Sequence, residues 1–157
     1  MMMHLFDRYQ DSLAGLESVR LGVAVALLDE NQRLLLELRS DVKMWGITGG
    51  RLDIGESPEE CGCREVFEET GISLSPQDLS LFGVYGDIKD RRVLQYPEIR
   101  VQLVDVIYTA TVSSSLPLIL SNESLQLKYF ESIAIPSAIV PPAIRPIKDL
   151  QSRGLVR

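Results

Sequence analysis

The sequence predicts a single α+β domain spanning residues 1–157, in which helices cover a mixed β-sheet. Three observations lead to this prediction: the length, a balance of 45% hydrophobic and 24% charged residues, and strand and helix patterns that alternate along the chain. The length suits one domain with one core, and no internal repeat or linker divides it. Helices and strands are interleaved, but neighbouring strands also form hairpin-like pairs. The sheet should therefore contain both parallel and antiparallel strands.

The periodicity of apolar residues predicts the first elements. Residues 5–16 place apolar side chains three and four apart, which predicts a short amphipathic helix. Residues 21–28 form an apolar run typical of a buried strand, residues 29–32 are polar turn residues, and residues 34–38 predict the second strand of the pair.

Later elements follow from the same patterns. Residues 79–85 and 101–112 predict strands, the second being rich in Val, Ile, Tyr and Thr. Residues 125–130 alternate apolar and polar side chains and predict another strand. Residues 142–153 begin with proline and end with a basic residue, which is typical of a terminal helix.

Composition excludes several classes of protein. The formal net charge of −6 and the pI near 4.8 argue against stable binding to nucleic acid, which normally needs a basic surface. The longest apolar run near the start, residues 21–28, is too short to cross a bilayer, and charged residues interrupt the first twenty positions. An acidic protein that handles phosphates needs a local positive site, for which a bound metal is the simplest source.

The two cysteines, Cys61 and Cys63, are separated by one residue. On a helix this spacing points the thiols to different faces, which suits neither a disulfide nor a zinc site. Free thiols favour a reducing compartment, so we expect the protein in the cytoplasm.

Residues 58–70 carry strong local signals for a helix. Ser57 can cap the N-terminus, Pro58 fits the first helical position, and Glu60 completes a capping box. Gly71 is a natural left-handed stop. These signals bound a helix of thirteen residues.

This helix concentrates acidic residues on one face. Glu65, Glu68 and Glu69 are three and four apart, and residues 56–69 hold six acids and one base, Arg64. Carboxylate oxygens are the donors that Mg²⁺ and Mn²⁺ prefer. From the carboxylates alone, a metal site and a solvated acidic face are both open.

The full spacing resembles the Nudix box at every defined position. Five residues separate Gly50 from Glu56, and seven more lead to Arg64 and Glu65. The aliphatic and acidic positions of the box and its closing glycine follow, occupied by Val66, Glu68, Glu69, Gly71 and Ile72.

The resemblance extends to the preceding residues 39–40 and 45–47, although Thr48 stands where a proline often precedes the two glycines. It covers nearly the whole chain and implies a Nudix-type α/β/α sandwich with a mixed sheet.

The Nudix resemblance implies a divalent metal, Mg²⁺ or Mn²⁺, held against a pyrophosphate. Glu65 and Glu69 would be the main metal ligands, Glu68 would assist or orient the attacking water, and the carbonyl of Gly49 would add a backbone ligand. Glu123, in the loop before strand 125–130, stands where many members keep a metal-binding or catalytic Glu; a solvated loop acid is the alternative reading, and Glu98 is a weaker candidate.

Two further groups of residues have implied roles. Glu56 and Arg64 would form an ion pair that fixes the loop to the helix. A basic and aromatic loop and one residue of the lead-in could contact the substrate: Lys89, Arg91, Arg92, Tyr96 and Arg39. The alternative for the loop is a solvent-exposed connection.

The implied activity is hydrolysis of a phosphoanhydride bond in a nucleoside diphosphate linked to another moiety. The classes are nucleoside triphosphates, nucleotide sugars and ADP-ribose, so the expected partner is a small-molecule nucleotide; a homodimer is left open. The alternative is a catalytically silent Nudix module that binds a nucleotide as a sensor, but this chain keeps every acid of the box.

Substrate marks outside the box are weak. Positions 87–89 hold neither the proline nor the tyrosine that marks two subfamilies. Residues 141–146 resemble the tail of MutT-type 8-oxo-dGTP enzymes, but Ile144 replaces the asparagine that reads the purine. An apolar side chain there predicts weak discrimination of 8-oxo-dGTP from dGTP.

Overall fold

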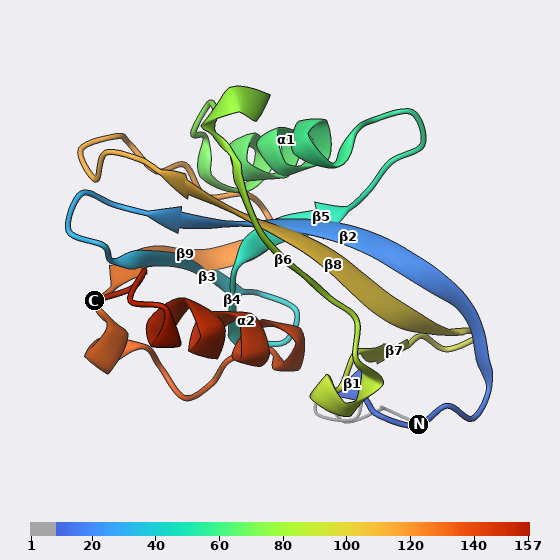
Figure 1. Cartoon of the computed structure of the whole chain (residues 1–157). Coiled ribbons are helices and arrows are strands. Elements are labelled where there is room, and N and C mark those ends of the chain that lie inside the picture. The colour runs from blue at the N-terminus through green and yellow to red at the C-terminus, as the bar shows by residue number, and fades with distance from the viewer. Residues whose placement is uncertain (1–8) are drawn as a thin grey trace.

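A computed structural model gives the structure of the protein and describes residues 9–157. The described residues form a nine-stranded mixed sheet with an α-helix on each face, α1 (Pro58–Thr70) and α2 (Pro141–Ser152) (Figure 1). The strands are β1 (Tyr9–Gln10), β2 (Leu16–Leu28), β3 (Leu34–Arg39), β4 (Trp45–Gly46), β5 (Thr48–Arg51), β6 (Ser80–Tyr85), β7 (Val93–Gln95), β8 (Arg100–Thr111) and β9 (Ser124–Phe130). Three short 3₁₀ helices are η2 (Pro76–Asp78), η3 (Ile88–Asp90) and η4 (Ser132–Ala134). The predicted fold class, a mixed sheet between helices, is confirmed.

The sheet runs in the order β1-β7-β8-β2-β3-β4, and β5, β6 and β9 pair with β2, β8 and β3. Strands β2 and β8 are parallel and pair along their full lengths, so they form the centre of the sheet. Among the described residues, the register of β2 with β3 consists of Leu28 opposite Leu34. Beyond that point β2 pairs with β5 while β3 pairs with β4 and β9, so the sheet divides into two halves.

Alternation along β2 creates a core on each face of the sheet. Val25 and Leu27 pack with Val66 of α1, whereas Ala26 and Leu28 pack with α2. Because side chains alternate with a period of two, the second half of β2, which is largely buried, is apolar on both faces. The five predicted strands and two of the three predicted helices, at residues 58–70 and 142–153, are confirmed, with ends that differ by a few residues.

The predicted helix at residues 5–16 is wrong in its described part, and residues 5–8 lie outside the described residues. Tyr9 and Gln10 form β1 against β7, and Gly15 has a φ of 72°. Tyr9 is buried against Leu94 and Val101, so a long-range strand pairing overrides the local helical spacing. Strands β4, β5 and β7 are too short to show a period and were not predicted.

The helices that the structure describes include none that is long and apolar enough to cross a membrane.

Candidate active site

Helix α1 has the boundaries that its caps predict. The Ser57 side chain accepts a hydrogen bond from the Glu60 N–H at 3.1 Å, and the Glu60 carboxylate accepts one from the Ser57 N–H at 2.9 Å. At the other end Gly71 is left-handed, with φ at 77°, and its N–H donates to the Phe67 carbonyl. The caps fix which residues face the sheet: Glu69 is buried, while the Glu68 side chain is 54% exposed.

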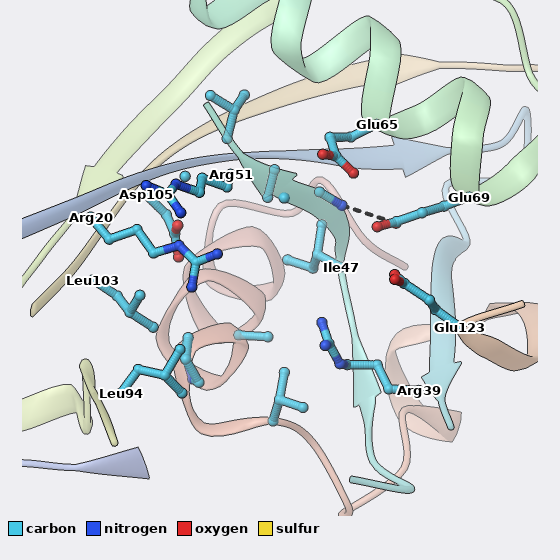
Figure 2. Close-up of a pocket in the computed structure, with 18 of the residues that line it drawn as sticks. Arg20, Arg39, Ile47, Arg51, Glu65, Glu69, Leu94, Leu103, Asp105 and Glu123 are labelled. Carbon is cyan, nitrogen blue, oxygen red and sulfur yellow. Dashed lines mark hydrogen bonds between the residues drawn. The ribbon is translucent and has the colours of Figure 1, made fainter. Parts of the chain in front are cut away.

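A cleft of about 530 Å³ opens where the two halves of the sheet divide. One end is acidic, because Glu65 and Glu69 of α1 and Glu123 from the loop before β9 point into the same space (Figure 2). Gly49 and Gly50 of β5 line the cleft beside them. The structure therefore brings together four of the five predicted metal-binding positions, and Glu68 lies outside the described lining.

Glu69 is the most constrained carboxyl group of the site. It is 7% exposed, and its Oε2 accepts a hydrogen bond from the Gly49 N–H at 3.1 Å. Burial, and then the adjacent Glu37 carboxyl, raise the pKa of Glu69 well above its usual range. A carboxylate here is stabilised by a positive charge, which is the electrostatic condition that a metal ion meets.

Glu37 is a site residue that the sequence analysis missed. It lies on β3, is 4% exposed, and accepts a hydrogen bond from the Ser124 hydroxyl. The available signal was a single acid within the apolar run of residues 34–38. Acids are almost never fully buried without a partner, so an acid within a buried strand indicates a paired or functional carboxyl group.

Glu65 lies one turn before Glu69 on α1, and its carboxyl group packs against the backbone of Gly50. A Cβ at Gly50 would stand 2.4 Å from the Glu65 carboxyl carbon, so glycine makes room for the carboxylate. Burial raises the pKa of Glu65, partly opposed by Arg64, whose guanidinium donates to Glu65 Oε1 at 2.9 Å. The acidic end thus holds two partly desolvated carboxyl groups.

The ion pair expected between Arg64 and Glu56 is present. Arg64 donates to the two Glu56 oxygens at 3.0 and 2.6 Å, and these bonds lower the pKa of Glu56 to about 2. Glu56 also accepts from the Asp53 N–H, and Arg64 donates to the Arg51 carbonyl at 3.1 Å. Together these contacts tie the loop that follows β5 to the middle of α1.

Glu123 is positioned by its own backbone. Its carbonyl accepts hydrogen bonds from the N–H of Ser40 at 2.8 Å and from the Ser40 hydroxyl at 2.9 Å. This holds the loop before β9 against the end of β3 and aims the carboxylate across the cleft (Figure 2). Glu98, the weaker candidate, lies outside the cleft lining that residues 9–157 form.

The predicted substrate residues are only partly brought together. Arg39 and Tyr96 line the cleft, whereas Lys89 and Arg91 lie outside its described lining, and Arg91 donates to the Tyr9 carbonyl. Arg92 is fully buried, so its prediction as an accessible phosphate-gripping cation is wrong. Long-range pairing with β8 draws this residue into the interior.

Arg20, Arg51 and Asp105 also line the cleft and were not predicted as site residues; they gather at the end away from the glutamates (Figure 2). Arg20 donates to the Tyr96 hydroxyl. Ile144, which the MutT-like tail placed at the base, is 39% exposed and lies outside the cleft lining formed by the described residues. The premise that Ile144 faces the substrate is therefore wrong.

The donor set of the acidic end suits a hard divalent cation. Glu65, Glu69 and Glu123 offer carboxylate oxygens to one cleft, and burying adjacent carboxyl groups is unfavourable unless a cation or a proton compensates. In the part of the chain that the structure describes, no three His, Cys, Asp or Glu side chains are already gathered closely enough to hold a metal. Metal binding would therefore require these side chains to rotate toward one another.

Gly49→Ala should destabilise the protein by about 1–3 kcal/mol, the usual range for overpacking. A Cβ at Gly49 would stand 2.4 Å from the Val23 carbonyl oxygen and 2.6 Å from the Ala24 Cα, both backbone atoms of β2. Gly50→Ala is the matched control, because its Cβ meets the end of the Glu65 side chain, which can change rotamer, rather than backbone atoms. Urea denaturation measures both changes, and an equal loss of stability in the two variants would contradict this account.

The comparisons with known proteins agree with one another. The family model for the NUDIX domain matches residues 18–150 of the chain. A protein of Bacillus subtilis (strain 168), named "Putative 8-oxo-dGTP diphosphatase", is 30% identical over 131 residues, which are 83% of this chain and 79% of that protein.

Two solved structures have a similar fold. The MutT NUDIX hydrolase from Burkholderia pseudomallei has a TM-score of 0.69 at 23% identity, covering 85% of this chain and 98% of that one. A bifunctional NMN adenylyltransferase/ADP ribose pyrophosphatase from Francisella tularensis, complexed with AMP and an Mn ion, has a TM-score of 0.63 at 18% identity. That match covers 89% of this chain and 43% of the other.

Proposed function

The chain belongs to the Nudix family of hydrolases, which act on compounds containing a nucleoside diphosphate, and we propose that it cleaves the phosphoanhydride bond of such a compound with a divalent metal. The substrate class is a nucleoside triphosphate, a nucleotide sugar or ADP-ribose. The observation that carries the proposal is the convergence of Glu65, Glu69 and Glu123 on one cleft beside Gly49. A cleft of about 530 Å³ is of the size that holds a small molecule.

Each acidic residue has a proposed role. Glu65 and Glu69 would hold Mg²⁺ or Mn²⁺, together with Glu123 and the carbonyl of Gly49. A bound ion would neutralise phosphate charge and lower the pKa of a water molecule. Glu68, at the exposed rim of α1, would orient the attacking water or assist with the metal.

The surrounding residues position these ligands and the substrate. The Glu56–Arg64 pair keeps Glu65 in place, because Arg64 contacts both carboxylates. Arg39 reaches the cleft beside Glu123 (Figure 2) and would contact phosphate. Tyr96 also lines the cleft, where its hydroxyl accepts a hydrogen bond from Arg20. The Cys61 and Cys63 thiols are free, which suits a reducing compartment, so we propose a cytoplasmic location.

A phosphate-release screen tests the proposal. Nucleoside triphosphates are assayed with inorganic pyrophosphatase, and nucleotide sugars and ADP-ribose with alkaline phosphatase, each with Mg²⁺ or Mn²⁺. The Glu69→Gln protein, purified identically, reports contaminating activity. We expect hydrolysis of at least one class by the wild type alone. Binding of a nucleotide without hydrolysis of any compound would contradict the proposal and favour the sensor.

Preference for 8-oxo-dGTP over dGTP should be below about tenfold. The cleft-lining residues of α2 and its approach are Val140, Pro142 and Ala143, which have no polar side-chain atoms. An apolar wall discriminates by only about 1–3 kcal/mol, whereas a polar group placed against the altered edge rejects its absence far more strongly. The two values of kcat/KM are measured under one metal condition, and a ratio above about a hundred would contradict the expectation.

A further inference from the structure

The floor of the cleft carries one acid away from the proposed metal ligands. Leu103, Asp105 and Ile107 alternate along β8, so their side chains share the face of the sheet that lines the cleft. Asp105 lies opposite Gly22 in the parallel pair of β8 with β2. A Cβ at Gly22 would stand 2.3 Å from Asp105 Oδ1, so only glycine at this position leaves room for the Asp105 carboxylate over β2.

Arg92 binds the other oxygen of the Asp105 carboxylate, Oδ2, from the buried side. The buried guanidinium donates to Asp105 Oδ2 at 2.7 Å and to the Pro142 carbonyl at 2.5 Å. It also lies over the Tyr85 ring, 5.6 Å from its centre. Because Arg92 is held on three sides, Oδ2 has a fixed partner, while the Asp105 side chain remains 23% exposed. Oδ1 is therefore the oxygen that can accept a hydrogen bond from a molecule in the cleft.

The strand register fixes the separation between Asp105 and the acidic end of the cleft, and this separation matches that between the phosphates and the base of a nucleotide. Gly49 pairs with Ala24, which pairs with Ile107, and Asp105 precedes Ile107 by two residues. With about 3.3 Å per residue along a strand and about 4.8 Å between strands, Asp105 lies roughly 12 Å from Gly49. A phosphate bound at the glutamates thus leaves room for a ribose before a base reaches Asp105.

The walls at this end suit the faces of a base. Leu94 and Leu103 lie beside Asp105 in the cleft (Figure 2), and Pro142 and Ala143 of α2 also line it. Apolar walls with a few fixed polar groups are the usual composition of a small-molecule site, in which the polar groups decide specificity; Arg20 and Arg51 supply donors at this end, and Asp105 supplies the carboxylate. A carboxylate offers acceptors alone, so the edge that it reads must present donors.

We propose that Asp105 is a specificity-determining residue that accepts hydrogen bonds from the Watson–Crick edge of guanine, so that guanine nucleotides are the preferred substrates. The inference rests on the proposed hydrolase function. Guanine presents two adjacent donors, N1–H and the N2 amino group, to one carboxylate oxygen. Adenine and cytosine each place a ring-nitrogen acceptor beside their amino group, and its lone pair would oppose the carboxylate.

Asp105→Asn tests the proposal through the ratio of kcat/KM for guanine and adenine compounds of the class that the screen identifies. Arg92 keeps the remaining oxygen of the amide, so the amide NH₂ faces the cleft and replaces an acceptor by a donor. The wild type should favour guanine by about tenfold or more, and the variant should lose or invert this preference. Asp78→Asn is the control, since it makes the same change at a residue outside the described cleft lining, where the amide oxygen can still accept from the Ser75 N–H, and it should leave the ratio unchanged.

Binding provides a readout that does not need turnover. Calorimetry should show tighter binding of GMP than of AMP to the wild type, with the difference lost in Asp105→Asn. If Asp105→Asn unfolds, Gly22→Ala replaces it, because its Cβ occupies the space of Oδ1 and should lower the same ratio. Circular dichroism establishes that each variant is folded.

The outcomes separate this inference from the proposed function. Hydrolysis of guanine and adenine compounds at equal kcat/KM, with equal binding of GMP and AMP, would overturn the role of Asp105 and leave the hydrolase intact. A variant that loses activity on both bases equally, or that changes only the preference between GMP and dGMP, would also overturn it. If no compound is hydrolysed but GMP still binds more tightly than AMP, the proposed hydrolase function is refuted and the recognition of guanine by Asp105 is supported.

Discussion

Glu69→Gln is expected to lower kcat by at least about a hundredfold while leaving the fold intact. Glutamine has the shape of glutamate and can still accept from the Gly49 N–H, so the change removes a charge and keeps the geometry. Losing one charged ligand should remove several kcal/mol of transition-state stabilisation, and each 1.36 kcal/mol is tenfold in rate. Steady-state kinetics on the substrate identified by the screen measures the effect.

Glu59→Gln is the matched control for this variant. Glu59 lies on the same helix, outside the described cleft lining, and its carboxylate accepts from the Tyr108 hydroxyl at 3.0 Å, a role that an amide oxygen can keep. Near wild-type turnover is expected for Glu59→Gln. Near wild-type turnover for Glu69→Gln would show that the metal is bound elsewhere.

The same substitution should hold or raise stability in metal-free buffer. Burial and the neighbouring Glu37 raise the pKa of Glu69, so between the ordinary carboxyl pKa near 4.5 and the raised one the folded state binds more protons than the unfolded state. The free energy of unfolding must then fall as pH rises through this window. In thermal melts in EDTA at increasing pH, the wild type should lose more stability than Glu69→Gln. An equal pH dependence of stability in the two proteins would show that Glu69 is not the group with the raised pKa.

Local signals were sufficient for the part of the site that lies on α1. Ser57, Pro58, Glu60 and Gly71 fixed the helix ends, because capping depends on neighbours within a few residues. The strands with long apolar runs were equally predictable from their own residues. The contact of Arg64 with Glu56 joins positions eight apart and was expected from the Nudix resemblance rather than from local pattern.

Long-range pairing decided what the sequence did not reveal. Tyr9 joins β7 through a pairing of residues 85 positions apart, which no helical period can foresee (Tyr9 opposite Leu94). Arg92 resembles a surface cation until β8 supplies Asp105 as a buried partner. Glu37 affects the site because its carboxyl group, on β3, lies beside Glu69 of α1 and raises the pKa of that group. In each case the chemistry of a side chain is set by a neighbour distant in sequence.

Excess EDTA is expected to abolish hydrolysis by the wild type, and added Mg²⁺ or Mn²⁺ should restore it. Glu65 and Glu69 are partly or largely buried, and burial without a cation raises the pKa of both carboxyl groups. Without a divalent ion the acidic end would also repel the phosphates of any nucleotide that enters the cleft. Initial rates in EDTA, and after titration of the metal back to excess, measure the effect.

Two controls make the chelation result decisive. EDTA saturated with Mg²⁺ before addition should leave the rate unchanged, which separates removal of the metal from inhibition by the chelator. Mg²⁺ or Mn²⁺ should also raise the melting temperature of the wild type in the absence of nucleotide, because an ion that binds the folded state alone stabilises it by mass action. Glu69→Gln should show a smaller rise, since it lacks one charged ligand. Hydrolysis at the full rate in excess EDTA would contradict the metal site, because the carboxylates of α1 would then have no cation to hold.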